Sequence, residues 1–295
     1  MSKLSKFAAA VLALGAVAAQ ASVVIDLFDQ PSTVDLDDAS DPNFKYVAKD
    51  KTVNSKFTWA TQYGPTGGAI GSYRDLGVSK TNGTQSSKLF VADGYLQFAN
   101  NPLQSSTGVV RWDGAGTGAG TTGDMTGVTD TGNAYTGLNY TGLGGVNLAA
   151  QADQFQFTVL SSDLGFTFAL EVYTDSTHWS RIVFESQAHS FLSPSGTPIP
   201  FTAFGACGYS DPSDSDNDDV LSVTCGSGGA VDFTSVGAIQ GIIDYAGLTN
   251  AANGKLDLDL TIDKLDSSKV PEPGSVALVG LALAGAGVAA RRRRN

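Results

Sequence analysis

The stretch Lys255-Leu-Asp-Leu-Asp-Leu-Thr-Ile-Asp263 alternates apolar and polar residues from Leu256 onward. Successive side chains of a β-strand point to opposite faces of the sheet, so the three leucines and Ile262 share one face, and the three aspartates and Thr261 share the other. The stretch therefore predicts a strand with one buried face and one solvated face. A sheet built from such strands must cover a hydrophobic core.

Other short segments carry the same signal along the chain. Asp93-Gly94 readily takes the positive φ angles of a type I′ turn, and alternating runs flank it, so residues 88–99 predict a β-hairpin. Further segments rich in aromatic and β-branched residues predict strands at 108–112, 154–159, 166–173, 179–184, 220–224 and 231–243. Because no convincing amphipathic helix lies among them, we expect an all-β fold, a jelly-roll-like sandwich of two antiparallel sheets. The segment 229–265 resembles the closing strands of carbohydrate-binding and lectin-like jelly rolls.

Residues 114–145 differ in composition from these segments. Eleven of the 32 residues are glycine, and threonine and asparagine are frequent. Such a segment cannot bury enough apolar surface to fold alone, so we expect a long surface loop. Its Gly-x-Gly runs are followed by neither a helix nor a lysine, which argues against a phosphate site. A spacer is the favoured interpretation, and a ligand-gripping loop is the alternative.

The N-terminal segment has the order of an export signal. Lys3 and Lys6 precede an apolar stretch from Phe7 to Ala19, and Ala19-Gln-Ala21 supplies a small-x-small cleavage site. We interpret residues 1–21 as a signal peptide with a helical apolar region, removed so that the mature protein begins at Ser22 outside the cytoplasm. A buried helix is the alternative, but the run is apolar on all sides.

The C-terminal segment combines a Pro-Glu-Pro sequence, an apolar run at 276–290 and a basic end. The residues concerned are Val270, Pro271, Glu272, Pro273 and Gly274, and then Arg291, Arg292, Arg293 and Arg294. A helix over the apolar run would be about 22 to 25 Å long, against about 30 Å of hydrocarbon core, so we expect a marginal transmembrane helix. Arginines at such an end stay on the cytoplasmic side, which leaves the domain facing outward.

This order of features resembles the PEP-CTERM sorting signal of Gram-negative bacteria. The resemblance implies that an exosortase, a membrane transpeptidase-like enzyme, cuts near the Pro-Glu-Pro and releases or transfers the exported protein. It implies the exosortase and the inner membrane as partners, and a link to extracellular polysaccharide and biofilm. An ordinary tail anchor is the alternative. The chain then divides into a signal peptide (1–21), one β-sandwich domain (22–269) and a sorting signal (270–295).

The central domain is strongly acidic. Once the residues of both ends are left out, 28 acidic and 12 basic side chains remain between residues 22 and 269, a net charge of −16. A field of this sign repels phosphate backbones, so nucleic acid is not expected as a partner. One domain is favoured over two because no Pro-rich or charged linker divides the segment.

Cys207 and Cys225 are the two cysteines of the chain. In an oxidising compartment an even pair is expected to form a disulfide. A metal or redox pair is the alternative, but it lacks a Cys-x-x-Cys spacing. The predicted disulfide would enclose an acidic run whose alternate carboxylates, Asp214, Asp216 and Asp218, have the spacing of calcium ligands. Calcium is therefore the one cofactor considered, and a solvated acidic loop is the competing interpretation.

Residues for catalysis are few. Glu171 and Glu185 are the only glutamates of the central domain, and neighbouring antiparallel strands could oppose them as in a jelly-roll glycosidase. His178 and His189 fit neither a nucleophile signature nor the spacing of a zinc site.

We therefore expect a non-catalytic surface or matrix protein that binds polysaccharide. A secreted glycoside hydrolase and a calcium-dependent adhesin are the alternatives. Sugar rings pack on aromatic side chains, for which the candidates are Trp59, Tyr63, Tyr73, Trp112, Tyr173 and Trp179.

Overall fold

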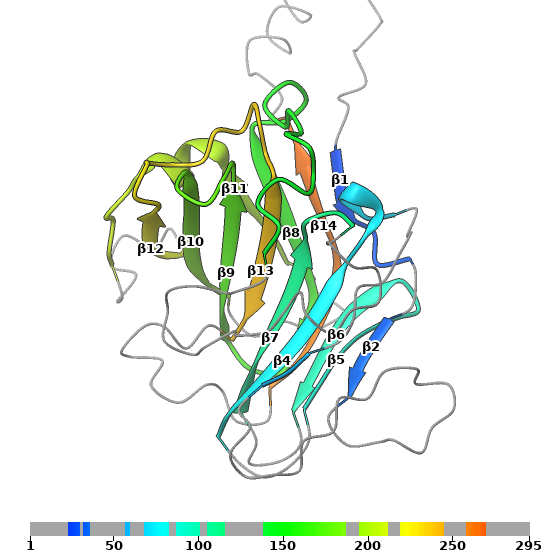
Figure 1. The fold of residues 1–295 in the computed structure, drawn as a ribbon. Helices are drawn as coiled ribbons and strands as arrows, with labels where there is room; N and C mark the ends of the chain where they lie inside the picture. The colour runs from blue at the N-terminus through cyan, green and yellow to red at the C-terminus, as the bar shows by residue number, and fades with distance from the viewer. Residues whose placement is uncertain are drawn as a thin grey trace, which may run out of the picture.

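The computed structural model describes residues 23–29, 32–35, 57–59, 68–82, 87–100, 105–115, 138–186, 195–211, 219–244 and 258–269. The predicted signal peptide, the sorting segment from residue 270 onward and most of the Gly-rich segment lie outside these ranges. Within them, the chain forms β-strands and two short 3₁₀ turns, η1 (Ile70–Ser72) and η2 (Phe201–Gly205) (Figure 1). Among the described residues no helix is long and apolar enough to span a membrane.

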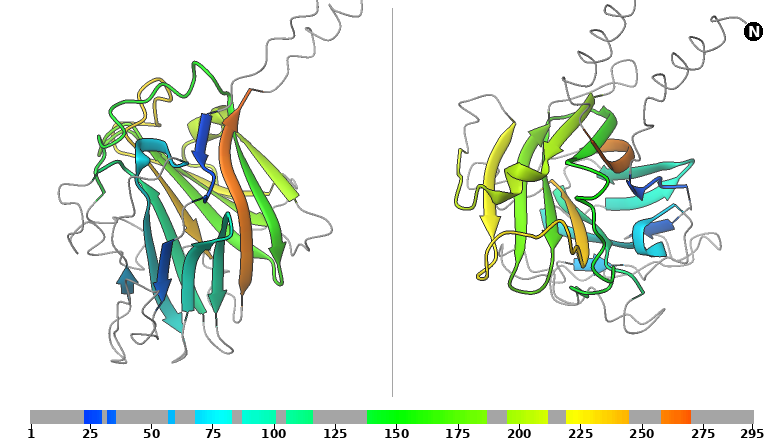
Figure 2. Two further views of the ribbon diagram at one scale, coloured as in Figure 1. Left: turned by 90° about the vertical axis from the view of Figure 1, so that its right-hand side faces the viewer. Right: turned by 90° about the horizontal axis from the view of Figure 1, so that it is seen from above.

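The strands form two antiparallel sheets, which confirms the predicted class. In the described residues, sheet A has the order β11 (Ser195–Pro200), β8 (Gln154–Ser162), β14 (Asp259–Ser268), β6 (Tyr95–Asn100), β5 (Ser87–Ala92) and β2 (Ser32–Asp35), with β1 (Val23–Asp26) beside β14. Sheet B has the order β12 (Val220–Cys225), β10 (Trp179–Ser186), β9 (Phe166–Tyr173), β13 (Ala238–Ile243), β7 (Ser105–Trp112), β4 (Asp75–Asn82) and β3 (Phe57–Trp59). Figure 2 shows the sheets as two layers.

Strand β14 has the two-faced burial that its sequence predicts. Leu258, Leu260 and Ile262 are buried, whereas Asp259 is exposed. A bulge follows, because the partners of Ile262 and Lys264 on β8 are the adjacent residues Val159 and Thr158. The bulge shifts the alternation by one residue and turns Leu265 into the core.

Aromatic side chains join the two sheets in the core. The ring of Phe157, from sheet A, lies with its centroid 4.3 Å from that of Phe168 and 5.9 Å from that of Phe184, both from sheet B. All three side chains are buried. Buried aromatic rings contribute large apolar areas and interlock at such distances, so the facing layers form one sandwich core.

The hairpin predicted at 88–99 is confirmed, with Asp93 and Gly94 at φ angles of 54° and 82° between β5 and β6. The strand predicted over 231–243 is correct only in its second half, which is β13. Before it, the carboxylate of Asp232 accepts hydrogen bonds from the backbone N–H and the hydroxyl of Thr234, at 2.8 and 2.7 Å. These bonds hold a turn in place of a strand.

A buried ion pair ties β1 to the opposite sheet. Arg74 donates two hydrogen bonds to Asp26, from Nε at 2.6 Å and from Nη2 at 2.5 Å. Trp112 of β7 donates from Nε1 to Asp26 at 2.6 Å, and the backbone N–H of Phe28 donates to it at 2.8 Å. These four residues, the Asp26 cluster, are buried. Because a buried carboxylate is tolerated only when paired and hydrogen-bonded, the cluster fixes the end of β1 in one position.

Candidate functional site

Three central strands of sheet B are buried on both faces. Every residue of β7, β9 and β13 is buried, although only alternate side chains face the sandwich core. Phe168, Leu170 and Val172 of β9 belong to that core, so Ala169, Glu171 and Tyr173 lie on the outer face. The outer face of sheet B therefore holds a second buried layer, and its chemistry differs from that of the core.

One row across this outer face is polar on five neighbouring strands. The pairing places each residue opposite the next, in the order Arg181, Glu171, Gln240, Arg111 and Asp75. All five side chains are buried, with exposed fractions from 0% to 5%. The next row along the strands is apolar, with Val183, Ala169, Ile242 and Val109 in register. We call the five polar residues the outer-face row.

Hydrogen bonds connect the outer-face row around Glu171. Its carboxylate forms an ion pair with Arg181 and accepts hydrogen bonds from Gln240 Nε2 at 2.8 Å and from the Tyr173 hydroxyl at 2.5 Å. Gln240 in turn accepts from Arg111 Nε at 2.8 Å. Burial, and then the negative charge of Glu171, raise the pKa of Tyr173 well above its usual value. The tyrosine is therefore kept as a hydroxyl donor.

Three aromatic rings lie next to one another beside the Arg181–Glu171 end of the outer-face row, where Trp179 and Tyr173 form the next cross-strand pair on that face. The ring centroids of Tyr140 and Tyr173 are 5.4 Å apart, and those of Tyr173 and Trp179 are 5.8 Å apart. Tyr173 is buried, whereas Tyr140 and Trp179 are partly exposed. The guanidinium of Arg181 lies 5.7 Å from the centre of the Trp179 ring, within the range of a cation–π contact. We call Tyr140, Tyr173 and Trp179 the aromatic ledge.

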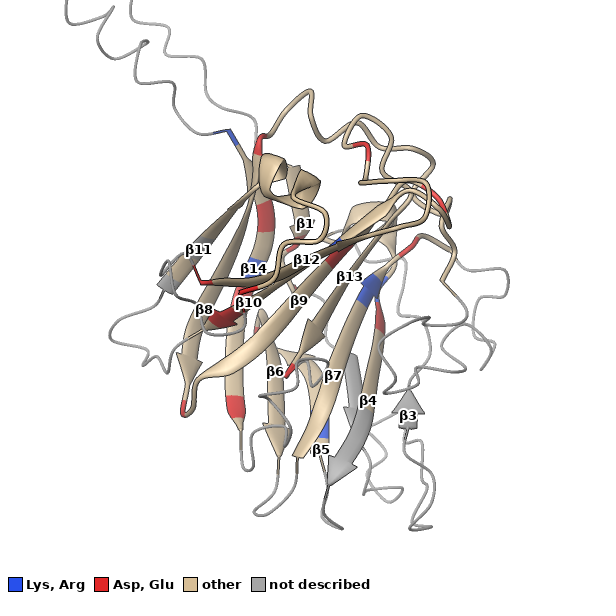
Figure 3. Ribbon diagram, turned by 90° about the vertical axis from the view of Figure 1, so that its left-hand side faces the viewer, with Lys and Arg blue, Asp and Glu red and all other residues tan. Residues whose placement is uncertain are grey.

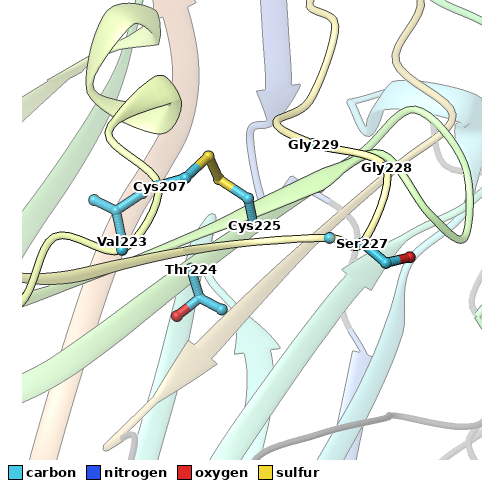
Figure 4. A pocket seen from close by; sticks show the side chains of 9 residues that line it. Cys207, Val223, Thr224, Cys225, Ser227, Gly228 and Gly229 are labelled. Carbon is cyan, nitrogen blue, oxygen red and sulfur yellow. A yellow bond between two sulfur atoms is a disulfide. The ribbon is translucent and has the colours of Figure 1, made fainter.

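The aromatic ledge adjoins a surface hollow of about 550 Å³ (Figure 4). Residues 207–208 and 223–229 line the hollow, and the disulfide between Cys207 and Cys225 lies at its side. Gly226 lines the hollow and also packs closely against the aromatic ledge: a β-carbon added at this glycine would lie only 2.6 Å from Trp179 Cδ1. The predicted disulfide is thus present, with a Cα–Cα distance of 5.4 Å, and it ties the segment after η2 to the edge strand β12.

The aromatic candidates from the sequence have different surroundings. Trp112 belongs to the Asp26 cluster and is buried in the core, so it cannot serve as an exposed platform. Tyr73 is partly exposed and directly follows η1 in the chain. Tyr63 and the side chain of Trp59 lie outside the described residues. Tyr140, which the sequence did not single out, completes the aromatic ledge with Tyr173 and Trp179.

The two glutamates do not stand opposite each other. Arg181 is the partner of Glu171, and Thr167 is the partner of Glu185. The two carboxyl-bearing positions are therefore separated by four steps along a strand pair, about 13 Å at the usual rise per residue. The opposed pair that the glycosidase alternative considered does not form, because the register of β9 with β10 places Arg181 opposite Glu171.

The remaining site predictions have mixed outcomes. Asp214, Asp216 and Asp218 lie outside the described residues, as does His189, so the calcium site stays a prediction. Within the described ranges, no group of three or more histidine, cysteine or acidic side chains is placed to hold a metal ion. His178 lies in the exposed β9–β10 turn, where its Nδ1 is 3.0 Å from Asp175. Basic segments are few among the described strands (Figure 3), in keeping with the acidic composition.

Comparison with known proteins identifies the C-terminal segment. A family model described as the PEP-CTERM protein-sorting motif matches residues 269–294. The resemblance seen in the sequence is thereby confirmed: residues 269–294 carry the PEP-CTERM sorting motif, which supports an exosortase-processed protein. The motif implies export, with a transient membrane-held state before cleavage. No curated protein sequence matches the chain.

Three solved structures show distant similarity in shape. The structure of PfGH50B has a TM-score of 0.36 at 10% identity, over 66% of this chain and 23% of that one. A family 11 carbohydrate-binding module from Clostridium thermocellum, in complex with a mixed-linked tetrasaccharide, has 0.30 at 13%, over 81% and 97%. An exo-β-agarase has 0.34 at 11%, over 75% and 25%. The chain thus spans about a quarter of the first and third, and scores this low assign no ligand.

Proposed function

We propose that this protein is a surface or extracellular-matrix component that an exosortase processes and whose sandwich domain binds polysaccharide. The sorting motif at residues 269–294 is the observation that carries export and processing. In this proposal the signal peptide at 1–21 starts export, and the apolar run at 276–290 holds the chain in the inner membrane until the cut. The jelly-roll-like domain then remains outside the cell.

The aromatic ledge is the proposed polysaccharide contact. Tyr140 and Trp179 offer partly exposed rings, and the apolar faces of sugar rings pack on such surfaces. Tyr173 and Arg181 both pack against the Trp179 ring, which restricts its motion before a ligand arrives. Thr174 and Asp232, in the adjoining turns, are joined by a hydrogen bond of 2.8 Å. A rigid ring surface bordered by polar turns can bind an extended glycan with little loss of the protein's conformational entropy.

We propose that the domain is not catalytic. Glu171 already accepts from Arg181, Gln240 and Tyr173, and its side chain is fully buried. Glu185 is too far along the strand pair to act with it. Hydrolysis of any member of a polysaccharide panel by the wild-type protein, lost in Glu171→Gln, would contradict this part of the proposal.

Polysaccharide binding is tested by changing one ring of the aromatic ledge. Trp179→Ala in the secreted protein is expected to weaken binding about tenfold, because one aromatic contact contributes roughly 1.5 kcal/mol. Affinity electrophoresis against a panel of extracellular polysaccharides measures the change. Tyr95→Ala is the matched control, since Tyr95 is also partly exposed but lies in β6 of the other sheet. Equal retardation of the wild type and Trp179→Ala would reject the aromatic ledge.

Export and processing are tested in cells with and without an exosortase. Mass spectrometry of the mature protein should find a new C-terminus near Pro271 to Pro273 only when the enzyme is present. A full-length chain in the cytosol of both strains would contradict the proposal.

A further inference from the structure

Strand β14 ends immediately before the sorting motif. Its last residues pair with β8, where Ser268 stands opposite Gln154, and the backbone N–H of Asp153 donates to Ser268 O at 3.0 Å. The motif match begins at the next residue, 269. Two residues, Lys269 and Val270, lie between Ser268 and Pro271, and an extended chain covers at most about 10 Å over these three residue-to-residue steps. Any cut at the Pro-Glu-Pro is therefore made close to the folded sandwich.

The start of the described chain lies beside this same point. Val23 is the pairing partner of Ser267, and the Ser267 hydroxyl donates to Val23 O at 3.1 Å. Figures 1 and 2 show β1 beside β14. The Asp26 cluster holds β1 in this place from the opposite sheet. The end of β14 is therefore fixed from two sides, by β8 and by β1, and does not separate easily from the sheet.

A small surface surrounds the end of β14. The backbone N–H of Phe201 donates to Asp153 O at 2.8 Å, which brings η2 next to Ser268. Asp153, Thr202 and Lys269 are exposed, and Val23 is partly exposed. We call these residues, together with Ser268, the terminal surface. The β8–β9 turn lies at the other end of the strands, where Asp163 N–H donates to Asp259 O at 3.2 Å.

We propose that the terminal surface is a docking site for the exosortase, so that the enzyme contacts the folded domain as well as the sorting motif. The inference rests on the proposed function, because it requires that an exosortase processes this chain. An enzyme that binds residues 271–273 must bring its own surface to within about 10 Å of Ser268. Because β1 and β8 hold β14 in the sheet, the enzyme meets the sandwich in its folded form. The partner is thus the outward face of a membrane enzyme, and the contact orients the domain for the cut.

A linker insertion distinguishes an enzyme that docks on the terminal surface from one that recognises only the sorting motif. A twelve-residue Gly/Ser insertion between Lys269 and Val270 of the full-length chain would move the motif away from the terminal surface by about 19 Å on average. We expect a several-fold loss in the rate at which the mature protein is released, measured by pulse-chase and immunoblot in exosortase-containing cells. The same insertion after Leu164, in the exposed β8–β9 turn, is the matched control and should leave the rate unchanged.

A second variant leaves the spacing intact. Thr202→Arg places a bulky cation on the terminal surface, and we expect it to slow release, whereas Leu164→Arg at the opposite end should not. Release at the wild-type rate in both the linker variant and Thr202→Arg would overturn the docking proposal while leaving exosortase processing in place. If the wild type itself is not processed, the proposed function fails, and the docking proposal fails with it.

Discussion

The two sheets of the sandwich treat their outer faces differently. In sheet A, β5, β6 and most of β8 alternate buried and partly exposed residues, so one face meets the core and the other meets solvent. In sheet B, β7, β9 and β13 are buried on both faces. These strands of sheet A are therefore buried on one face only, whereas the central strands of sheet B are buried on both faces.

The difference is accompanied by a difference in where charge is buried. The Asp26 cluster lies between the sheets and joins β1 of sheet A to the segment around β4 and β7 of sheet B. The outer-face row lies on the far side of sheet B and runs across its strands. Buried ion pairs add little net stability over an apolar replacement, but they penalise any arrangement that breaks them. The first cluster thus specifies how the sheets meet, and the second specifies the register within one sheet.

Breaking the cluster between the sheets should have the largest effect. Asp26→Ala leaves the Arg74 guanidinium and the Trp112 N–H buried without their acceptor, and we expect a loss of about 3–5 kcal/mol in the free energy of unfolding. Urea unfolding followed by tryptophan fluorescence measures it. Asp29→Ala, which removes an exposed carboxylate three residues further on, should change stability by less than about 0.5 kcal/mol. A small loss for Asp26→Ala would show that β1 is not held by the ion pair.

Removing the disulfide is the next largest change, and it acts on the edge of sheet B. The bond closes a sequence separation of 18 residues, for which the chain-entropy relation gives about 3 kcal/mol. The double variant Cys207→Ala/Cys225→Ala should lose stability by this amount in urea unfolding. Reduction of the wild-type protein by dithiothreitol should reproduce the loss, whereas the double variant should not respond to the reductant. A response in the double variant would point to an effect of the reagent itself.

Four of the seven described strands of sheet A, namely β5, β6, β8 and β14, were predicted from the sequence, because one-sided burial leaves a period of two. Leu260 and Ile262 of β14, and Leu258 just before it, face the core as the pattern predicts, and Asp93-Gly94 forms the predicted turn. Strand β11 gave no such signal. It contains Pro198 and Pro200, which are tolerated because β11 is an edge strand with one paired side.

The outer face of sheet B could not be predicted in the same way. A strand buried on both faces has no alternation, so the sequence did not distinguish Glu171 and Arg181 from exposed strand residues. The members of the outer-face row come from five strands, from Asp75 to Gln240, and only the register brings them together. Likewise, 48 residues separate Asp26 from Arg74 in the chain. The local pattern indicates which side chains share a face, but long-range pairing decides which charges meet.

A conservative change in the outer-face row should have a smaller effect than loss of the Asp26 cluster. Glu171→Gln keeps the size of the side chain but removes the negative charge that pairs with Arg181 and replaces one acceptor oxygen by an NH2 donor, so we expect about 2 kcal/mol of destabilisation. Urea unfolding gives the value. The control is Glu185→Gln, a partly exposed glutamate on the same face, which should be close to neutral. If both variants are equally mild, the row does not specify the register of sheet B.

The smallest predicted effect is a pH dependence at the exposed turn that joins β9 to β10. The backbone N–H of His178, and then the backbone N–H and hydroxyl of Thr177, donate to Asp175 and hold the pKa of its carboxyl well below the usual 3.8. Because the folded pKa is depressed, the stabilisation is fully present above the unfolded pKa and is lost as the pH falls through the lower, folded value. The stability difference between the wild type and Asp175→Ala should therefore be constant at neutral pH and shrink below about pH 4. Carboxyl ¹³C NMR should show Asp175 titrating below 3.8, and an ordinary midpoint would mean that the turn does not form in solution.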